Sequence, residues 1–254
     1  TNMNFAFHQV IEYDIVINEI MADPSPTFAL PEYEYFELFN NTNYDISLYN
    51  WKVRIGTSDK IIPFKKIPAN GYIIVCSSTA ESALSVYSNT IGILGSIDLT
   101  NAGKEISILN NFDLLIDYLS YSDSWYQNTS KDDGGWSLEK IDPNNNCSTL
   151  GNWIASESIT GGTPGQQNSV FAENIDNQAP EIENISITSA NTLTVTFSEN
   201  INETDASVLS NYLVDNAINP ISAFVDAENK NIVYLSFTAD FSEGAHNIKI
   251  YNIR

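Results

Sequence analysis

Histidine is the side chain that most often serves as the base in nucleophilic catalysis, and this sequence contains only two, His8 and His246. His8 lies in an N-terminal arm and His246 lies in the last segment. The sequence has no G-x-S-x-G, P-loop, H-E-x-x-H or C-x-x-C motif, so the usual signatures of hydrolase, nucleotide, metalloprotease and redox chemistry are missing. We therefore interpret both histidines as surface or strand residues and predict that the chain is not an enzyme.

Paired carboxylates are a second route to catalysis, because glycosidases use two of them around the scissile bond. Glu32, Glu34 and Glu37 gather around the strand-like run of residues 33–38. In an extended strand, Glu32 and Glu34 share one face and Glu37 lies on the other. Because this spacing implies no single cleft, we predict that these carboxylates lie on a solvated face.

Oxygen-rich loops are candidates for calcium, which binds about 6 to 8 oxygen ligands. Residues 142–146 match the start of a calcium loop, but Cys147 stands where that loop needs glycine and Trp153 where it needs glutamate. We interpret this run as turn-forming asparagines. We predict that the chain requires no cofactor and that calcium is the metal to test. The candidate calcium ligands lie in one loop of the second half: Glu199, Asn202, Glu203 and Asp205.

Aromatic residues are abundant, with 13 Tyr, 12 Phe and 4 Trp. Most of them are expected in the core. Trp125 and Tyr126 differ, because they lie within the polar run of residues 121–127. They are our candidates for contact with a sugar or a protein ligand, and burial is the alternative interpretation.

Cys76 and Cys147 are the only cysteines in the sequence. An even number in a chain rich in Thr, Ser, Asn and Tyr is compatible with one disulfide in an oxidising compartment. Cys76 also ends an apolar, strand-like run, so it fits a small buried hydrophobic residue equally well. The sequence leaves both interpretations open.

The charge of the chain excludes one class of partner. The sequence holds 32 acidic and 11 basic residues, a formal net charge of -21, and its only arginines are Arg54 and Arg254. Nucleic acid binding depends on Lys and Arg side chains that displace counterions from phosphates, so we exclude nucleic acid. We interpret the acidity as a source of solubility and expect a monomer. No apolar run approaches the ~18 residues of a membrane-spanning helix, and no membrane span is predicted.

Hydrophobic residues recur with a period of two along the sequence, which is typical of β-strands. Residues 50–55 alternate apolar and polar side chains, as expected for a strand with one buried face. Asn110 and Asn111 separate two strand-like runs and predict a hairpin, because asparagine tolerates positive φ. One short helix is predicted near residues 79–87. Many short strands without interposed helices favour a sandwich or barrel.

A polar stretch that follows a Gly- and Pro-containing segment divides the sequence. Beyond it, Leu193, Val195 and Phe197 alternate with threonines, which indicates a second small sandwich. This part is shorter than the ~100 residues of a full immunoglobulin sandwich, so we expect it to be truncated. The predicted parts are an N-terminal arm (1–13), a first sandwich (14–171), a linker (172–180) and a second sandwich (181–254).

Ordered sequence blocks in the first part resemble the lamin tail domain family. Each block alone is weak evidence, but their shared order is far more specific. Lys104 departs from the family pattern, which frequently has an acid at that position. The blocks are VINEIMADP (16–24), EYFELFN (34–40), ISLYNWKV (46–53), IPANGYIIV (67–75), LTNAGKEI (99–106), GWSLEKIDP (135–143) and GTPGQQN (162–168).

The resemblance implies an immunoglobulin-like sandwich used for attachment and protein interaction, and it transfers no catalytic residue. The D-P-S-P and G-G-W-S sequences are similar to copies in large secreted or outer-surface proteins of Gram-negative bacteria. The second half resembles the immunoglobulin-like domains that follow such modules. We therefore predict an all-β chain of two immunoglobulin-like β-sandwich domains in tandem, in a secreted, periplasmic or cell-surface location.

The predicted function is that of a non-catalytic interaction or scaffolding module within a larger secreted bacterial protein. Its expected partners are other domains of the same surface protein, or a protein or glycan ligand. Two alternatives remain, a glycan-binding accessory module of a secreted enzyme and a domain of a hydrolase whose catalytic part lies elsewhere. A fold alone does not decide among them.

Overall fold

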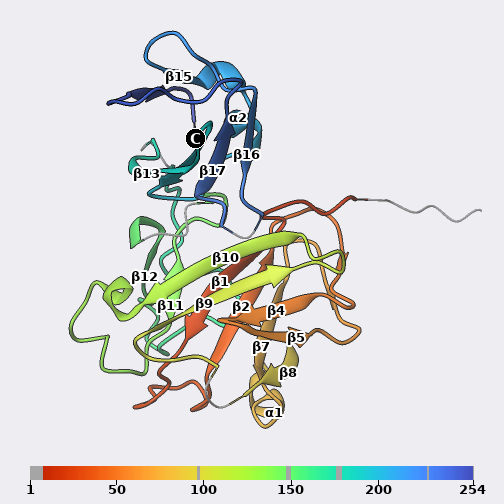
Figure 1. The fold of residues 1–254 in the computed structure, drawn as a ribbon. Helices are drawn as coiled ribbons and strands as arrows, with labels where there is room; N and C mark the ends of the chain where they lie inside the picture. The colour runs from red at the N-terminus through yellow and green to blue at the C-terminus, as the bar shows by residue number, and fades with distance from the viewer. Residues whose placement is uncertain (1–7, 96–97, 147–149, 176–178, 228, 254) are drawn as a thin grey trace, which may run out of the picture. The chain divides into compact units, whose positions relative to one another are not determined.

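The chain folds into two compact units, Thr1–Ile175 (unit 1) and Asp176–Arg254 (unit 2). The computed structural model describes residues 8–95, 98–146, 150–175, 179–227 and 229–253. Both units consist mostly of β-strands in sandwich-like sheets (Figure 1), which confirms the predicted all-β fold of tandem immunoglobulin-like sandwiches. No helix in these described ranges is long and apolar enough to cross a membrane.

One sheet of unit 1 has the strand order β12-β11-β1-β2-β7-β8. Neighbouring strands run antiparallel, except that β7 and β8 run parallel. The short helix α1 (Glu81–Leu84) joins this parallel pair and confirms the predicted helix. The strands are β1 (Ile15–Met21), β2 (Tyr35–Asn40), β7 (Tyr72–Ser77), β8 (Asn89–Leu94), β11 (Leu138–Lys140) and β12 (Trp153–Ala155).

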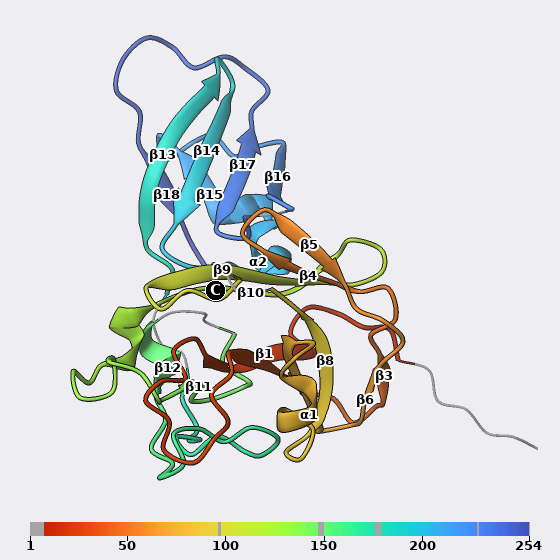
Figure 2. The ribbon, with the colours of Figure 1, turned by 90° about the horizontal axis from the view of Figure 1, so that it is seen from below.

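The other main sheet of unit 1 has the order β10-β9-β4-β5 and lies across the first as a separate layer (Figures 1 and 2). The predicted hairpin joins β9 to β10, although Asp113, and neither asparagine, takes the positive φ of its loop. A small pair, β3 (Ile46–Ser47) and β6 (Lys66–Ile67), lies beside these sheets. The strands of the second sheet are β4 (Lys52–Ile55), β5 (Ser58–Ile61), β9 (Gly103–Leu109) and β10 (Leu115–Ser122).

Apolar side chains from both sheets form the core of unit 1. Ile17 and Ile20 of β1 pack in the same buried cluster as Val53 and Ile106 from the opposite sheet. Burying an aliphatic side chain of this size stabilises the fold by about 2 kcal/mol. After β10 the chain turns through the 3₁₀ helix η1 (Asp123–Tyr126), and η2 (Leu150–Asn152) precedes β12.

Unit 2 is a smaller sandwich of the sheets β13-β14-β17-β16 and β15-β18. Leu193, Val195 and Phe197 of β14 are buried against Tyr212 and Val214 of β15, as the alternating pattern predicts. The elements are β13 (Ile182–Ser189), β14 (Thr192–Phe197), α2 (Glu203–Ala206), η3 (Leu209–Asn211), β15 (Tyr212–Val214), β16 (Ser222–Val225), β17 (Ile232–Ser236) and β18 (Ile248–Ile250).

Candidate functional site

Three glutamates lie side by side inside unit 1 and form what we call the carboxylate cluster: Glu19, Glu37 and Glu139. Glu19 on β1 stands opposite Glu139 on β11 and opposite Glu37 on β2. All three have a solvent-exposed fraction of 0%. Cross-strand neighbours share one face of a sheet, so strand register alone brings these carboxyl groups together.

Glu37 corrects the sequence prediction that it lies on a solvated face. The prediction assumed that one face of its strand is wet, whereas β2 is an inner strand covered on both faces. Glu32 is exposed and Glu34 is partly exposed, as expected for residues before the strand begins. Glu19 and Glu139 were missed altogether, because they are far apart in sequence and only the sheet register joins them.

Residues 162–170, which we call the closing segment, cover the carboxylate cluster through main-chain donors. The Thr163 amide donates to Glu19 Oε1 at 2.8 Å and the Gly165 amide to Glu37 Oε2 at 2.5 Å. The Val170 amide donates to Glu139 Oε2 at 3.2 Å. Each glutamate therefore holds a different part of the closing segment on the sheet.

Side chains add further hydrogen bonds to the carboxylate cluster. Tyr35 Oη donates to Glu19 Oε1 at 2.9 Å, and Thr163 Oγ1 donates to Glu139 Oε1 at 2.8 Å. Asn168 Nδ2 donates to the carbonyls of Asn18 and Lys140, both at 2.8 Å, and its Oδ1 accepts from Asn18 Nδ2 at 2.9 Å. These bonds join β1, β11 and the closing segment at one buried point.

Burial and the charge of a neighbouring glutamate raise the pKa of two members of the carboxylate cluster, Glu19 and Glu37. Burial, followed by the charge of Glu139, raises the pKa of Glu19 from 4.5 to about 7. Burial, followed by the charge of Glu19, raises the pKa of Glu37 well above its usual range. Glu19 Oε2 and Ser137 Oγ are both buried without a hydrogen-bond partner among the described residues. At neutral pH, Glu19 is therefore partly protonated, and the raised pKa of Glu37 favours its protonated form as well.

A catalytic carboxylate pair has to reach its substrate, whereas this carboxylate cluster is sealed between a sheet and the closing segment. Its hydrogen-bond acceptors are used to hold main chain and hydroxyl groups of the protein itself. Buried polar groups that are well paired specify one packed arrangement of the chain. We interpret the carboxylate cluster as the structural closure of unit 1.

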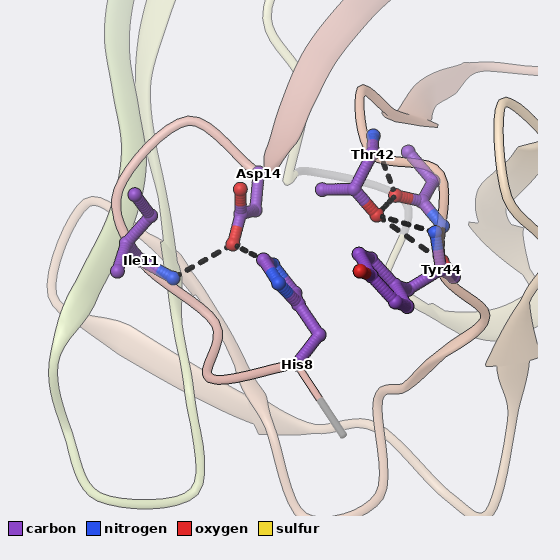
Figure 3. Close-up of polar contacts among 6 residues, drawn as sticks. His8, Ile11, Asp14, Thr42 and Tyr44 are labelled. Atoms are coloured by element: carbon purple, nitrogen blue, oxygen red, sulfur yellow. Dashed lines mark hydrogen bonds and ion pairs between the residues drawn. The ribbon is translucent and has the colours of Figure 1, made fainter. Parts of the chain in front are cut away.

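His8 and His246, the two histidines, each pair with a nearby aspartate. His8 stacks on Tyr44 with ring centroids 4.8 Å apart, and its Nε2 lies 2.8 Å from Asp14 Oδ2 (Figure 3). In unit 2, His246 Nδ1 lies 2.6 Å from Asp215 Oδ2, and this hydrogen bond is the largest cause that raises the pKa of His246. Both contacts tie surface segments together, as expected for structural histidines.

Trp125 and Tyr126 lie in the core, so burial is the correct interpretation of the two that the sequence left open. They are 8% and 4% exposed, and Trp125 packs on Trp153 with ring centroids 5.9 Å apart. Tyr126 Oη donates to the Trp136 carbonyl at 3.1 Å. The sequence signal for this burial was Ser122, a residue type that often begins a helical turn. Its Oγ accepts from the Ser124 amide and caps η1, and this turn folds both rings inward.

The candidate calcium loop of unit 2 has structural uses for its side chains. Asn202 Oδ1 accepts from the Asp205 amide at 3.1 Å and so caps α2, while Glu203 pairs with Lys230 at 3.6 Å. Within the described ranges no group of three or more His, Cys, Asp or Glu side chains is placed to hold a metal ion. Calcium binding by Glu199 and its neighbours stays a prediction.

Cys76 is buried on β7 without a disulfide partner among the described residues, and burial raises the pKa of its thiol to about 11. A thiol with a raised pKa is largely protonated at neutral pH and is a poor nucleophile. Cys147 lies outside the described residues. The pairing of Cys76 with Cys147 therefore stays a prediction.

Large apolar side chains that remain exposed gather at one end of the β10-β9-β4-β5 sheet, and we call them the end patch. The rings of Tyr49 and Phe64 meet edge to face with centroids 5.9 Å apart. Ile61 occupies the last row of the sheet, where it pairs with Lys52, and Lys52 pairs in turn with the β9-β10 loop. The end patch consists of Tyr49, Ile61, Phe64, Phe112 and Leu114, which are between 52% and 78% exposed.

Fold and site together define an all-β protein of immunoglobulin-like sandwiches with a sealed carboxylate cluster and an exposed apolar patch. Within it, residues 12–123 match the family model of the Lamin Tail Domain. Lamin tail domains are non-catalytic immunoglobulin-like modules, which agrees with the sequence resemblance. No curated protein matches the chain. The match includes Glu19 and Glu37, whereas Glu139 and the closing segment lie beyond it.

Proposed function

We propose that the chain is a non-catalytic interaction and scaffolding module of a larger bacterial protein that acts outside the cell. The lamin tail match supports an interaction module. The resemblance of the D-P-S-P and G-G-W-S sequences to copies in bacterial surface proteins supports the location. The net charge of -21 favours solubility and disfavours anionic lipid or nucleic acid as the partner. Its partner is a protein, either another domain of the parent protein or a separate ligand.

The single observation that carries this proposal is the end patch. Large exposed apolar side chains that lie near one another often mark interaction sites, and within the end patch the rings of Tyr49 and Phe64 are in contact. Aromatic residues are enriched at the centres of protein interfaces, and Phe64 and Phe112 are both highly exposed here. Ion pairs of Lys66 with Asp45 at 2.7 Å and of Lys52 with Asp113 supply a charged rim.

Site-specific photo-crosslinking in cells that produce the full parent protein tests this role. A photoreactive residue at Phe64 or Phe112 is expected to capture the same partner protein, because both positions belong to the end patch. Val86, an exposed aliphatic residue beside α1, is the matched control and is expected to capture none. Equal labelling from all three positions, or no specific product from Phe64 and Phe112, contradicts the proposal.

Glycan binding is a second candidate function, and an aromatic pair in unit 2 favours it. Phe224 and Tyr234 lie side by side on the face of the sheet turned away from the core, with ring centroids 5.1 Å apart. Asp226 accepts a hydrogen bond from Tyr234 Oη at 3.1 Å and brings a carboxylate next to the rings. A glycan array tests it, since binding lost in Phe224→Ala supports this role and absence of binding refutes it.

A further inference from the structure

The first part of the closing segment, residues 163–167, is held on the sheet by carboxyl groups, and we call it the latch. The Thr163 amide donates to Glu19 and the Thr163 hydroxyl donates to Glu139, both at 2.8 Å. The Gly165 amide donates to the third member of the carboxylate cluster. Among the described residues, no other hydrogen bond joins the latch to the rest of unit 1. The hold on the latch therefore depends on the state of three carboxyl groups.

The chain on both sides of the latch is anchored by groups that carry no charge. Before it, the Ser137 amide donates to the Gly161 carbonyl at 2.8 Å. After it, Asn168 Nδ2 donates to the carbonyls of Asn18 and Lys140, both at 2.8 Å. Small residues in a loop often absorb the backbone rotations of a moving segment, and Gly161 directly precedes the closing segment. The latch can therefore lift between two fixed points.

The titratable groups that face the carboxylate cluster, among the described residues, are its own members and the tyrosines Tyr35 and Tyr72. Burial raises the pKa of Tyr72 to about 12 and that of Tyr35 further, so both are neutral from pH 5 to 8. The latch has no titratable residue. Lys140 follows Glu139 along β11 and so points to the opposite face, where its charge acts on the buried Asp117.

Ionisation of the carboxylate cluster favours a lifted latch. Burial, followed by the charge of Glu139, raises the pKa of Glu19 to about 7, and burial raises the pKa of Glu37 as well. Lifting the latch admits water, so the pKa of Glu19 returns toward its ordinary value of 4.5. The closed form is then most favoured below pH 4.5 and loses this advantage as the pH rises through about 7.

We propose that the latch is a pH-sensitive lid of unit 1, which opens more often as the carboxylate cluster ionises and then uncovers the outer face of β1, β2 and β11. Phe36 and Leu38 flank Glu37 on β2 and pack in the core, so the carboxyl group of Glu37 lies on that outer face. The latch shares no residue with the end patch. Its test is therefore independent of the proposed interaction role.

Hydrogen exchange of the Thr163 and Gly165 amides in the whole chain, followed by NMR from pH 5 to pH 8, tests the proposal. For one carboxyl group with a pKa of about 7 when closed and 4.5 when open, the opening equilibrium increases about seventyfold over this range. After correction for the intrinsic exchange rate, we expect the protection of both amides to fall tenfold or more. Low urea should leave their exchange unchanged, because local opening exposes little surface.

Two comparisons separate the latch from the rest of the fold. Amides of the inner strands β4 and β9 are expected to be better protected than the latch at every pH, and low urea should accelerate their exchange. Glu19→Gln should reduce the pH dependence of latch exchange, whereas Glu32→Gln, at an exposed carboxylate, should keep it. The wild-type pH series stands by itself if Glu19→Gln fails to fold.

Three results would overturn the proposal. The first is protection of the Thr163 and Gly165 amides that stays constant or increases from pH 5 to pH 8. The second is exchange of these amides that urea accelerates as much as exchange in β4 and β9, because the latch would then open only when unit 1 unfolds. The third is a folded Glu19→Gln variant whose latch exchange has the pH dependence of the wild type.

Discussion

Replacing Glu19 by glutamine is expected to reduce the pH dependence of folding. Burial raises the pKa of Glu19 from 4.5 to about 7, so the folded state binds a proton that the unfolded state releases. Stability is then greatest below pH 4.5 and falls as the pH rises through about 7. At ~1.4 kcal/mol for each pH unit of that interval, the loss amounts to about 3 kcal/mol.

Urea unfolding at pH 5, 6, 7 and 8 measures this effect, because the free energy of unfolding is extrapolated separately at each pH. Glutamine has the shape of protonated glutamic acid and carries no charge. The Glu19→Gln variant should therefore match the wild type at pH 5 and exceed its stability at pH 8, by up to about 3 kcal/mol. Glu32→Gln, at an exposed carboxylate, is the matched control and should follow the wild type.

Two results would refute this reasoning. If Glu19→Gln has the same pH dependence as the wild type, the proton is not held at Glu19. If the wild type becomes more stable from pH 5 to pH 8, the carboxylate cluster is ionised in the folded state. Glu37, whose pKa burial also raises, is expected to leave a slope in the same direction in the Glu19→Gln variant.

Further predictions concern individual contacts. Asn168→Ala should lower the free energy of unfolding by about 2 kcal/mol or more, because it leaves buried partners on β1 and β11 unpaired; an unchanged melting curve would contradict this. Trp125→Ala should lower the free energy of unfolding by about 3 kcal/mol, measured by urea unfolding, because it opens a cavity in the core. An unchanged free energy of unfolding would indicate that Trp125 lies on the surface. Asp215→Asn should lower the pKa of His246 in an NMR titration. Since the pKa of His246 is raised in the folded state, its contact with Asp215 stabilises the fold fully below about pH 6.5, and this stabilisation is lost as the pH rises through the folded pKa. A His246 pKa that does not change in Asp215→Asn would exclude the pairing.

Strands with one wet face could be predicted from the sequence. In β4 and β14 the apolar positions alternate with polar ones, because only one face of each strand contacts the core. The short helix near residue 81 and the β9-β10 hairpin were also predictable from local signals. The sequence did not predict which residue of the hairpin loop has a positive φ. The loop is longer than a two-residue turn, and Asp113 takes that conformation in place of an asparagine.

The carboxylate cluster could not be predicted, because the alternation rule assumes that polar residues of a strand face water. Glu37 lies on the face that the closing segment covers, and Gly165, which donates to it, is 128 residues further along the chain. A contact of that separation leaves no local signal. The lamin tail blocks around Glu19 and Glu37 located the strands but did not indicate that their carboxyl groups meet inside the fold.

Aromatic residues in polar sequence were ambiguous for a related reason. Polar neighbours placed Trp125 and Tyr126 near the surface, whereas η1 turns both rings onto the core beside Trp153. Phe64 and Phe112, by contrast, follow or interrupt strand-like runs and gave no sign of exposure. Exposure of a large side chain depends on what the tertiary fold fails to cover, and sequence periodicity does not report it.

The central claim is that the end patch of unit 1 binds a partner. The most direct test is the retention of a double variant, Phe64→Ser with Phe112→Ser, at the surface of cells that produce the parent protein. The account predicts an unchanged melting temperature, because both side chains are exposed, together with loss of retention and of the crosslinked partner. Retention equal to that of the wild type and of Val86→Ser would contradict it.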